Sequence, residues 1–455
     1  MSIVRLRGLA FGAAFGIAAT VGAHDVGAAD ADWLTALSGP LAEAGYSLNW
    51  KSMSLDPAKG RVQARGLTSA DAAGRVVLRI AGVAVDRPRP APGGSWTADV
   101  LVLDKVEVPG ATPTRIQRVV VTRPDLGSVA RLMATVMDAR TGAADPAERP
   151  IEVERLELQG LDQEWTADGG ERIAATVATV QVSSLQLDPA AFAVAGDPSR
   201  LRPLSALAAV RVGLFEAEGV RVRSSQSGIT EIDRKWIKNT ARVPGRSGVL
   251  QYGNAGVRMR PGGPGDPMAP LLATLFPPHG DVPSQSSGEI AYDVAEGFLG
   301  LRQRTEIDRF GTLDVNADLR GVPDLTVDAW RSVRDDDPRL DATLVHGLSV
   351  ALTDAGGVDR ALATMADDGS VTPAQLRAAF ATQFDVIGQG FNPNRDPLFA
   401  AWLGAVRDFV RIGGTLALAA ARPIPVTALA DQELELEAGA LTGLARRYGL
   451  SLERR

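Results

Sequence analysis

Cysteine is absent from this chain of 455 residues. The absence excludes disulfide bonds, thiolate zinc sites, iron–sulfur clusters, cysteine nucleophiles and a lipid-modified N-terminal cysteine. Without disulfides the fold must depend on its hydrophobic core, and the chain is long enough to form two or three domains with sizeable cores.

Histidine is also scarce, with three residues in the whole sequence. His24 lies beside an expected cleavage site, His279 lies in a segment rich in proline and glycine, and His346 alternates with apolar residues in a strand-like run. A site with three histidine ligands is therefore not available, and the interpretation we favour for His346 is a polar strand residue facing solvent.

A basic surface is a third absence, since the formal net charge is −6. Five of the 48 basic residues are lysine, and we attribute this bias to a GC-rich coding composition and not to a functional arginine patch. We therefore expect no nucleic-acid partner. Past residue 30 no apolar run approaches the length of a membrane span, so we expect no stable transmembrane span in the mature chain.

The N-terminal segment has the three-part layout of a secretory signal peptide. Arg5 and Arg7 precede an apolar run of 16 residues (8–23), and small residues follow up to Ala28. We predict a signal peptide at residues 1–28, cleaved after Ala23 or Ala28, and a periplasmic location. The alternative is an uncleaved anchor helix, for which the run is short.

Period-two apolar spacing dominates the next part of the chain and predicts a β-rich domain at residues 29–243. A helix at 124–139 interrupts it, with Leu126, Val129, Met133 and Val136 on one face. The strand-like runs are 50–55, 60–67, 75–85, 98–108, 114–123, 151–160, 175–187 and 207–224.

Several of these runs skip one position of the alternation. In Val182-Ser183-Ser184-Leu185-Gln186-Leu187, strict alternation would place Val182 on the opposite face from the two leucines. A β-bulge at the serines would return all three apolar residues to one face and bend the strand. Five other runs share the pattern: Trp50-Met53-Leu55, Leu103-Val106-Val108, Val153-Leu156-Leu158, Leu207-Val210-Val212 and Val345-Leu348-Val350.

The composition changes at residues 244–287, where proline, glycine and serine predict a loop or linker. Residues 288–455 then predict an α+β domain with strands over 288–323, 340–354 and 414–421 and helices over 372–388, 397–411 and 438–448. The fold class that we predict is α+β: a long, curved, mostly antiparallel β-sheet with bulges, covered by several amphipathic helices, and more helical toward the C-terminus.

No motif in the sequence predicts catalysis, a cofactor or a metal. The segment 367–376 resembles the second half of a calcium-binding loop but has too few carboxylates to hold the ion, and a helix cap by Thr372 and Gln375 explains it better. Asp314, Asn316 and Asp318 lie two apart and are expected on the solvated side of a strand. We read the helix at 397–411 as covering a core, with membrane-surface docking as the alternative.

Two stretches resemble a known family. YSLNWKSMSLDPAKGRVQARGLTSAD, at residues 46–71 after the signal segment and a short helix, is similar to AsmA-like and related uncharacterised proteobacterial envelope proteins. The segment LVHGLSVALTDAGGVDRALATMADDGSVTPAQLRAAF resembles the closing part of such proteins, as does GGTLALAAARPIPV. This resemblance implies a periplasmic protein with an elongated, curved sheet and an apolar inner face.

Three hypotheses for function follow. The first is a non-catalytic periplasmic protein that acts in envelope maintenance or binds envelope proteins. The second is a lipid-handling protein that holds phospholipid or another envelope lipid in an apolar groove. The third, a hydrolase of unrecognised type, lacks any convergent set of acidic residues. The residues expected to line the groove are Val180, Val182, Leu185 and Leu187.

Overall fold

The computed structural model divides the chain into two compact units. Unit 1 comprises residues 1–241 and 326–328, and unit 2 comprises residues 242–325 and 329–455. The structure describes residues 46–91, 96–110, 112–129, 151–167, 170–187, 202–225, 228–260, 276, 282–326, 329, 338–366, 371–390, 397–430 and 438–455.

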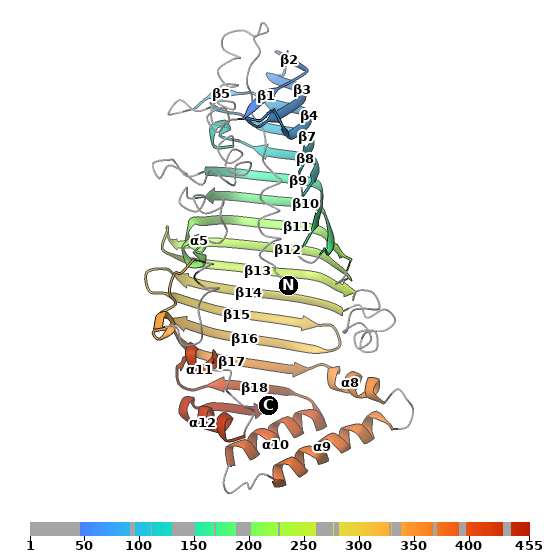
Figure 1. Ribbon diagram of the computed structural model, residues 1–455, viewed down its shortest axis with the longest axis vertical. Coiled ribbons are helices and arrows are strands. Elements are labelled where there is room, and N and C mark those ends of the chain that lie inside the picture. Colours follow the sequence, from blue (N-terminus) through green and yellow to red (C-terminus); the bar gives the residue numbers. More distant parts are fainter. Residues whose placement is uncertain are drawn as a thin grey trace. The chain divides into compact units, whose positions relative to one another are not determined.

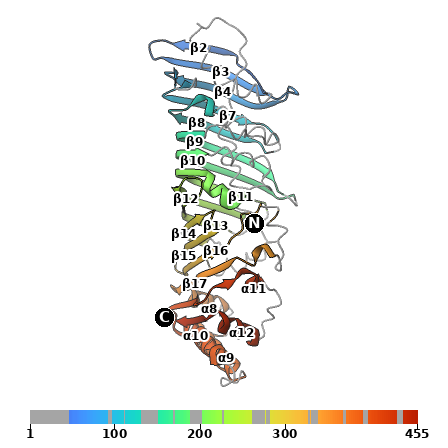
Figure 2. The same ribbon diagram turned by 90° about the vertical axis from the view of Figure 1, so that its left-hand side faces the viewer.

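Unit 1 is an antiparallel meander (Figure 1). Each of its main strands pairs with its neighbours in the sequence, and Figure 2 shows β7 to β11 following one another in chain order. In the part of unit 1 that the structure describes, helix is limited to α5 and residues 126–129. The elements are β1 (Ser47–Asn49), β2 (Ser52–Asp56), β3 (Arg61–Ala70), β4 (Val76–Asp86), β5 (Arg89–Pro90), β6 (Trp96–Thr97), β7 (Val100–Val108), β8 (Thr114–Thr122), β9 (Ile151–Thr166), β10 (Arg172–Leu187), α5 (Pro203–Ala209), β11 (Val210–Ser224) and β12 (Gly228–Val243), whose last two residues belong to unit 2.

Unit 2 is a second antiparallel meander with helices in its C-terminal part. This agrees with the prediction that the chain becomes more helical toward the C-terminus. Its strands β13 to β18 also pair in chain order, and β20 pairs with β18. The elements are β13 (Ser247–Arg260), β14 (Val282–Asp293), β15 (Phe298–Ile307), β16 (Gly311–Arg320), η3 (Pro338–Leu340), β17 (Leu344–Asp354), α8 (Gly357–Met365), α9 (Pro373–Gly390), α10 (Pro397–Ile412), β18 (Thr415–Ala420), β19 (Ile424–Pro425), α11 (Val426–Ala430), α12 (Ala438–Tyr448) and β20 (Leu450–Arg454). The α+β class and the antiparallel sheet with bulges are therefore confirmed.

The core of unit 1 lies on one face of its sheet. Alternation along each strand sends one set of side chains to this face and the other set to solvent, where Arg115 pairs with Asp162 and Arg118 pairs with Asp104. Leu126 and Val129, in the described start of the helix predicted at 124–139, also belong to the core. The fully buried strand residues include Leu78, Ile80, Leu101, Ile116, Leu156, Leu158 and Leu185.

A line of unpaired residues crosses the sheet of unit 1. We call it the kink column: Gly66, Ala81, Lys105, Gln117, Gly160, Ala178 and Gly219. On every second strand the column residue has a positive φ of 53° to 62°, namely Gly66, Lys105, Gly160 and Gly219. On each strand, one apolar side chain before the column and one after it point to the core. On β7 these are Leu103 and Val106, which lie on either side of Lys105. The column thus lets the apolar face continue across the skipped positions.

The bulge predicted at Ser183-Ser184 has no extra residue, because the register of β10 with β9 and β11 is unbroken there. The strand is instead kinked in the same way as at the kink column. Ser184 has φ 49° and lies outside the ladder, with Val182 paired to Leu156 and Leu185 paired to Val153. Val182 and Leu185 consequently share the core face. Two of the six sequence patterns do not form a strand throughout. Trp50 lies between β1 and β2, and Leu207 lies in α5, where Pro203 supplies a favourable first residue for a helix.

Part of the segment predicted as a loop or linker at 244–287 consists of strands. β13 covers residues 247–260 and β14 begins at Val282. Glycines hid the alternation of β13, because Gly256 has φ 60° and lies where its register with β14 shifts. Residues 261–275 and 277–281 lie outside the described part of the chain.

The predicted helix ends of unit 2 are confirmed. The backbone N–H of Thr372 donates to Oε1 of Gln375 at 2.8 Å, and the N–H of Gln375 donates to Oγ1 of Thr372 at 3.2 Å, so a capping box starts α9. Gly413, at φ 68°, ends α10. Several other predictions fall outside the described residues: the signal peptide at 1–28, the short helix before residue 46 and most of the helix at 124–139.

Candidate functional site

The best candidate site is one face of the sheet in unit 2. Residues directly opposite each other in an antiparallel pair share a face. The registers from β13 to β18 therefore assign side chains to faces in rows that run across the strands. One row is Leu250, Ile290, Leu301 and Ala317; the second is Tyr252, Gly288, Gln303, Val315, Val350 and Leu418; the third is Asn254, Ser286, Thr305, Leu313, Leu352 and Leu416.

These three rows contain no charged residue, and we call them the neutral face. The charged side chains of β14 to β16 lie on the other face. There Arg304 pairs with Asp314 at 3.2 Å, and Nδ2 of Asn316 donates to Oγ of Ser349 at 3.2 Å. Asp314, Asn316 and Asp318 share that face, as the sequence predicted, and Asp318 pairs in register with the half-buried His346. Charge returns to the neutral side only at its borders, with Asp354 at the end of β17 and Arg454 of β20, which pairs with Leu416.

Apolar side chains on the neutral face remain partly open to solvent. Leu313 and Leu352 are directly paired on β16 and β17, and each is 40% exposed. Val315 and Val350, the next pair along these strands, are half-buried. In unit 1, by contrast, most of the corresponding apolar side chains are buried. Exposed leucines side by side on a sheet face are a feature of binding surfaces.

A group of neutral polar side chains occupies the other part of the neutral face, on β13 to β15. Tyr252 donates from its hydroxyl to Oε1 of Gln303 at 3.4 Å, and Nε2 of Gln303 donates to Oγ1 of Thr305 at 3.3 Å. Nδ2 of Asn254 donates to Oγ of Ser286 at 3.1 Å. We call these five residues the polar group.

Gly288 makes room for the polar group. It lies between Tyr252 and Gln303 in the second row, and a Cβ atom at this position would lie 2.4 Å from Cζ of Tyr252. The absence of a side chain therefore allows the tyrosine ring to lie across β14 and bring its hydroxyl to Gln303 on β15.

The residues predicted to line a groove are elsewhere, in unit 1. Val180, Val182 and Leu185 are 2%, 2% and 1% exposed and belong to the core. Their neighbours across the strands are themselves apolar, since Val180 pairs with Leu158 and Ala217. The structure therefore places these three side chains in the core and not in a groove open to solvent. Leu187 pairs with Ile151 and Val210 at the end of β10, and its side chain is outside the described set.

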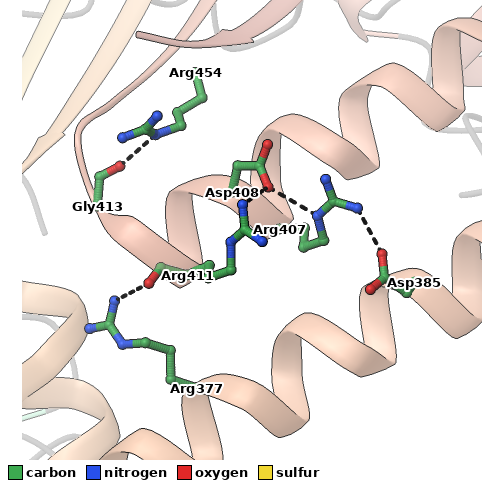
Figure 3. Close-up of polar contacts among 7 residues, drawn as sticks. All are labelled: Arg377, Asp385, Arg407, Asp408, Arg411, Gly413 and Arg454. Atoms are coloured by element: carbon green, nitrogen blue, oxygen red, sulfur yellow. Dashed lines mark hydrogen bonds and ion pairs between the residues drawn. The ribbon is translucent and has the colours of Figure 1, made fainter.

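A second polar cluster joins the helices of unit 2 (Figure 3). Arg407 on α10 donates to Asp385 of α9 at 2.8 Å and to Asp408 at 3.0 Å. Arg377 of α9 donates to the carbonyl oxygens of Val410 and Arg411, at 2.9 and 3.0 Å, and so satisfies the end of α10. Arg407, beside the apolar face of the helix at 397–411, thus joins α10 to α9, whereas the side chain of Arg411 pairs with Asp408 of the same helix.

The charges of this cluster shift the pKa of its members. Hydrogen bonds to Asp385 and then Asp408 raise the pKa of Arg407, which stays charged at any ordinary pH. The hydrogen bond from Arg407 and then the charge of the same guanidinium, with smaller contributions from Arg411 and Arg454, lower the pKa of Asp408 below its usual range. The contribution of Asp408 to stability is therefore complete above its unfolded pKa of about 3.9 and is lost as the pH falls through the lower folded value.

We expect Asp408→Asn to reduce the stability of unit 2 by about 1 kcal/mol or less at neutral pH, because Asp408 is partly exposed and its ion pairs are screened. The variant should also lose less stability than the wild type between pH 6 and pH 3. Urea unfolding at the two pH values, followed by the helical circular dichroism signal, measures both effects. An identical pH dependence in the two proteins would contradict this account.

The described residues include neither a metal-binding cluster nor a membrane-spanning helix. No group of three or more His, Cys, Asp or Glu side chains there could hold a metal ion. Within the same residues, no helix is long and apolar enough to cross a membrane.

Comparison with known proteins bears on the C-terminal part of the chain. A family described as an uncharacterized protein matches residues 304–454, about a third of the chain. The match begins within β15 and ends within β20, so it includes Leu313, Leu352 and the helical cluster but not Tyr252 or Asn254. No curated protein and no solved structure matches the chain.

Sequence reasoning gave part of the signal for this site. The sequence shows that Leu313, Val315, Ala317 and Leu319 alternate with Asp314, Asn316 and Asp318. Our prediction concerns only the second set, which we expect on the solvated side of a strand. The polar group was missed because Tyr252 and Asn254 lie in the glycine-rich stretch predicted as a loop. Only the register shows that they share a face with Leu313.

Proposed function

We propose that this chain is an exported, non-catalytic binding protein of the bacterial envelope, located in the periplasm, and that the neutral face of unit 2 holds the acyl part of a lipid. The observation that carries the proposal is the directly paired, half-exposed Leu313 and Leu352 on a face without charge. An acyl chain would cover these leucines together with Val315 and Val350. Covering apolar surface in this way is worth about 25 cal/mol per Å².

The absence of charge from three consecutive rows between β13 and β18 supports the same proposal. A sheet that met water equally on both sides would have no reason to exclude charge from three consecutive rows on one of them. The charged face, with pairs such as Arg304 and Asp314, is suited to solvent. The resemblance of residues 46–71 to AsmA-like envelope proteins is in keeping with a lipid as the ligand.

The test is lipid binding by the purified full-length protein, measured by native mass spectrometry before and after removal of lipid and on adding it back. We expect Leu313→Glu with Leu352→Glu to lower acyl-lipid uptake at least about tenfold, since about 1.4 kcal/mol of lost contact is sufficient. Thr312→Glu with Thr353→Glu is the matched control, because these residues are also directly paired but lie on the charged face. Wild-type protein that takes up no lipid would refute the proposal.

A protein partner is the second candidate, and the outer side of α9 favours it. The two charged residues of this helix, Arg377 and Asp385, are both engaged with neighbouring helices. Ala374, Ala378 and Thr382 are exposed, and Val386 is 60% exposed. An exposed helix side without charge is suited to docking against another protein. If the wild-type protein takes up no lipid in native mass spectrometry, a protein partner remains the candidate function.

A further inference from the structure

The neutral face is divided between polar and apolar residues at one boundary. In its second and third rows, the residues on β13 to β15 are neutral and mostly hydroxyl- or amide-bearing, whereas those on β16 to β18 are leucine and valine. The change falls between Gln303 and Val315 in one row and between Thr305 and Leu313 in the next. Since strands lie about 4.8 Å apart, each part is about 10 Å wide.

One hydrogen-bonding atom of the polar group is unused. Oδ1 of Asn254 is buried, and it has no hydrogen-bond partner among the residues that the structure describes. The amide nitrogen of the same side chain donates to Ser286, which fixes the oxygen as the free acceptor. A buried acceptor without a partner is unusual and calls for a donor.

From these two observations we infer that the lipid held by the neutral face is an uncharged amphiphile with a hydroxyl-bearing head. The inference rests on the function proposed above and specifies its ligand. The acyl chain lies over Leu313, Val315, Val350 and Leu352, and a hydroxyl of the head donates to Oδ1 of Asn254. A phosphate or carboxylate head over the polar group is disfavoured, because the three rows offer no cation from β13 to β18 to replace the water that such a group would lose. Arg454, which continues the third row on β20, donates to the carbonyl oxygen of Gly413.

The matched Asn–Ser pairs of unit 2 make the inference testable. Asn254 and Ser286 form a cross-strand pair on the neutral face, and Asn316 and Ser349 form one with nearly the same distance on the charged face. Asn254→Leu removes the free acceptor, whereas Asn316→Leu makes the same chemical change on the other side of the sheet. Thr305→Val, which is nearly isosteric, alters the polar group in case Asn254→Leu does not fold.

The probes are three ligands with the same twelve-carbon acyl chain: monolauroylglycerol, laurate and methyl laurate. Binding to the delipidated full-length protein is measured by isothermal titration at pH 8. We expect monolauroylglycerol to bind at least tenfold more tightly than laurate and at least threefold more tightly than methyl laurate. Asn254→Leu should abolish the preference over methyl laurate without weakening methyl laurate itself, and Asn316→Leu should change neither ratio.

Two outcomes overturn the inference while leaving the proposed function intact. One is laurate binding as tightly as monolauroylglycerol. The other is an unchanged ratio of monolauroylglycerol to methyl laurate in both Asn254→Leu and Thr305→Val. Failure of all three ligands to bind the wild-type protein would instead refute the proposed function, and this inference with it.

Discussion

Gly219→Ala is expected to lower the free energy of unfolding of unit 1 by about 2–4 kcal/mol. Gly219 has φ 61°, where any residue with a Cβ pays about 1–2 kcal/mol. The new Cβ would also lie 2.9 Å from Cβ of Ala178 on β10, and a side chain forced into filled space costs about 1–3 kcal/mol. Ala178 cannot turn its methyl group away, because a Cβ is fixed by the backbone.

The measurement is hydrogen exchange of the β10 and β11 amides in increasing urea. Gly74→Ala is the matched control, since Gly74 has φ 76° with no atom within 4 Å of a new Cβ, so it isolates the backbone cost. Adding Ala178→Gly to Gly219→Ala should restore the part of the free energy of unfolding that is lost through the contact between the two Cβ atoms. A cost for Gly219→Ala no larger than that for Gly74→Ala would show that close approach at the kink column is unimportant.

Leu185→Ala is expected to cost about 2–5 kcal/mol, the range for truncating a leucine in a packed core. Leu185 on β10 is 1% exposed, and it pairs with Val153 on β9 and with Val212 on β11. The cost arises from lost apolar contact and from the cavity left behind. This variant decides between a core and a groove, because a leucine lining an open groove would lose far less.

The comparison for Leu185→Ala is Leu352→Ala on the neutral face. Leu352 is 40% exposed, so its truncation should cost about 1 kcal/mol or less. Urea unfolding of the delipidated protein, with hydrogen exchange assigned to each unit, measures both variants. Equal costs for the two would contradict the assignment of Leu185 to the core and of Leu352 to a binding surface.

The alternation of apolar residues was sufficient to predict the antiparallel sheet and its apolar side. It also located the kink at Ser184, because a skipped position between Val182 and Leu185 leaves few other ways to bury both. The helix ends at Thr372 and Gly413 follow from local side-chain and backbone chemistry, which short segments contain in full.

The candidate site could not be predicted in the same way. Burial of Val180 and half-exposure of Leu313 depend on what packs above each face, and equal alternation in two segments does not reveal this difference. The polar group requires the register of three strands, so Asn254 and Thr305, far apart in sequence, gain meaning only when Ser286 is aligned between them. Non-local pairing is the information that a single sequence lacks.

The chain-order pairing of strands has a consequence for how the protein is made. From β7 to β11 in unit 1, and from β13 to β17 in unit 2, each strand pairs with the strand that precedes it in the sequence. The connections are short from β14 to β17 and longer elsewhere, and the entropy of closing a loop grows only slowly with its length. A polypeptide that emerges N-terminus first from a narrow exit could therefore add one strand at a time to the growing sheet, before its C-terminal part has emerged.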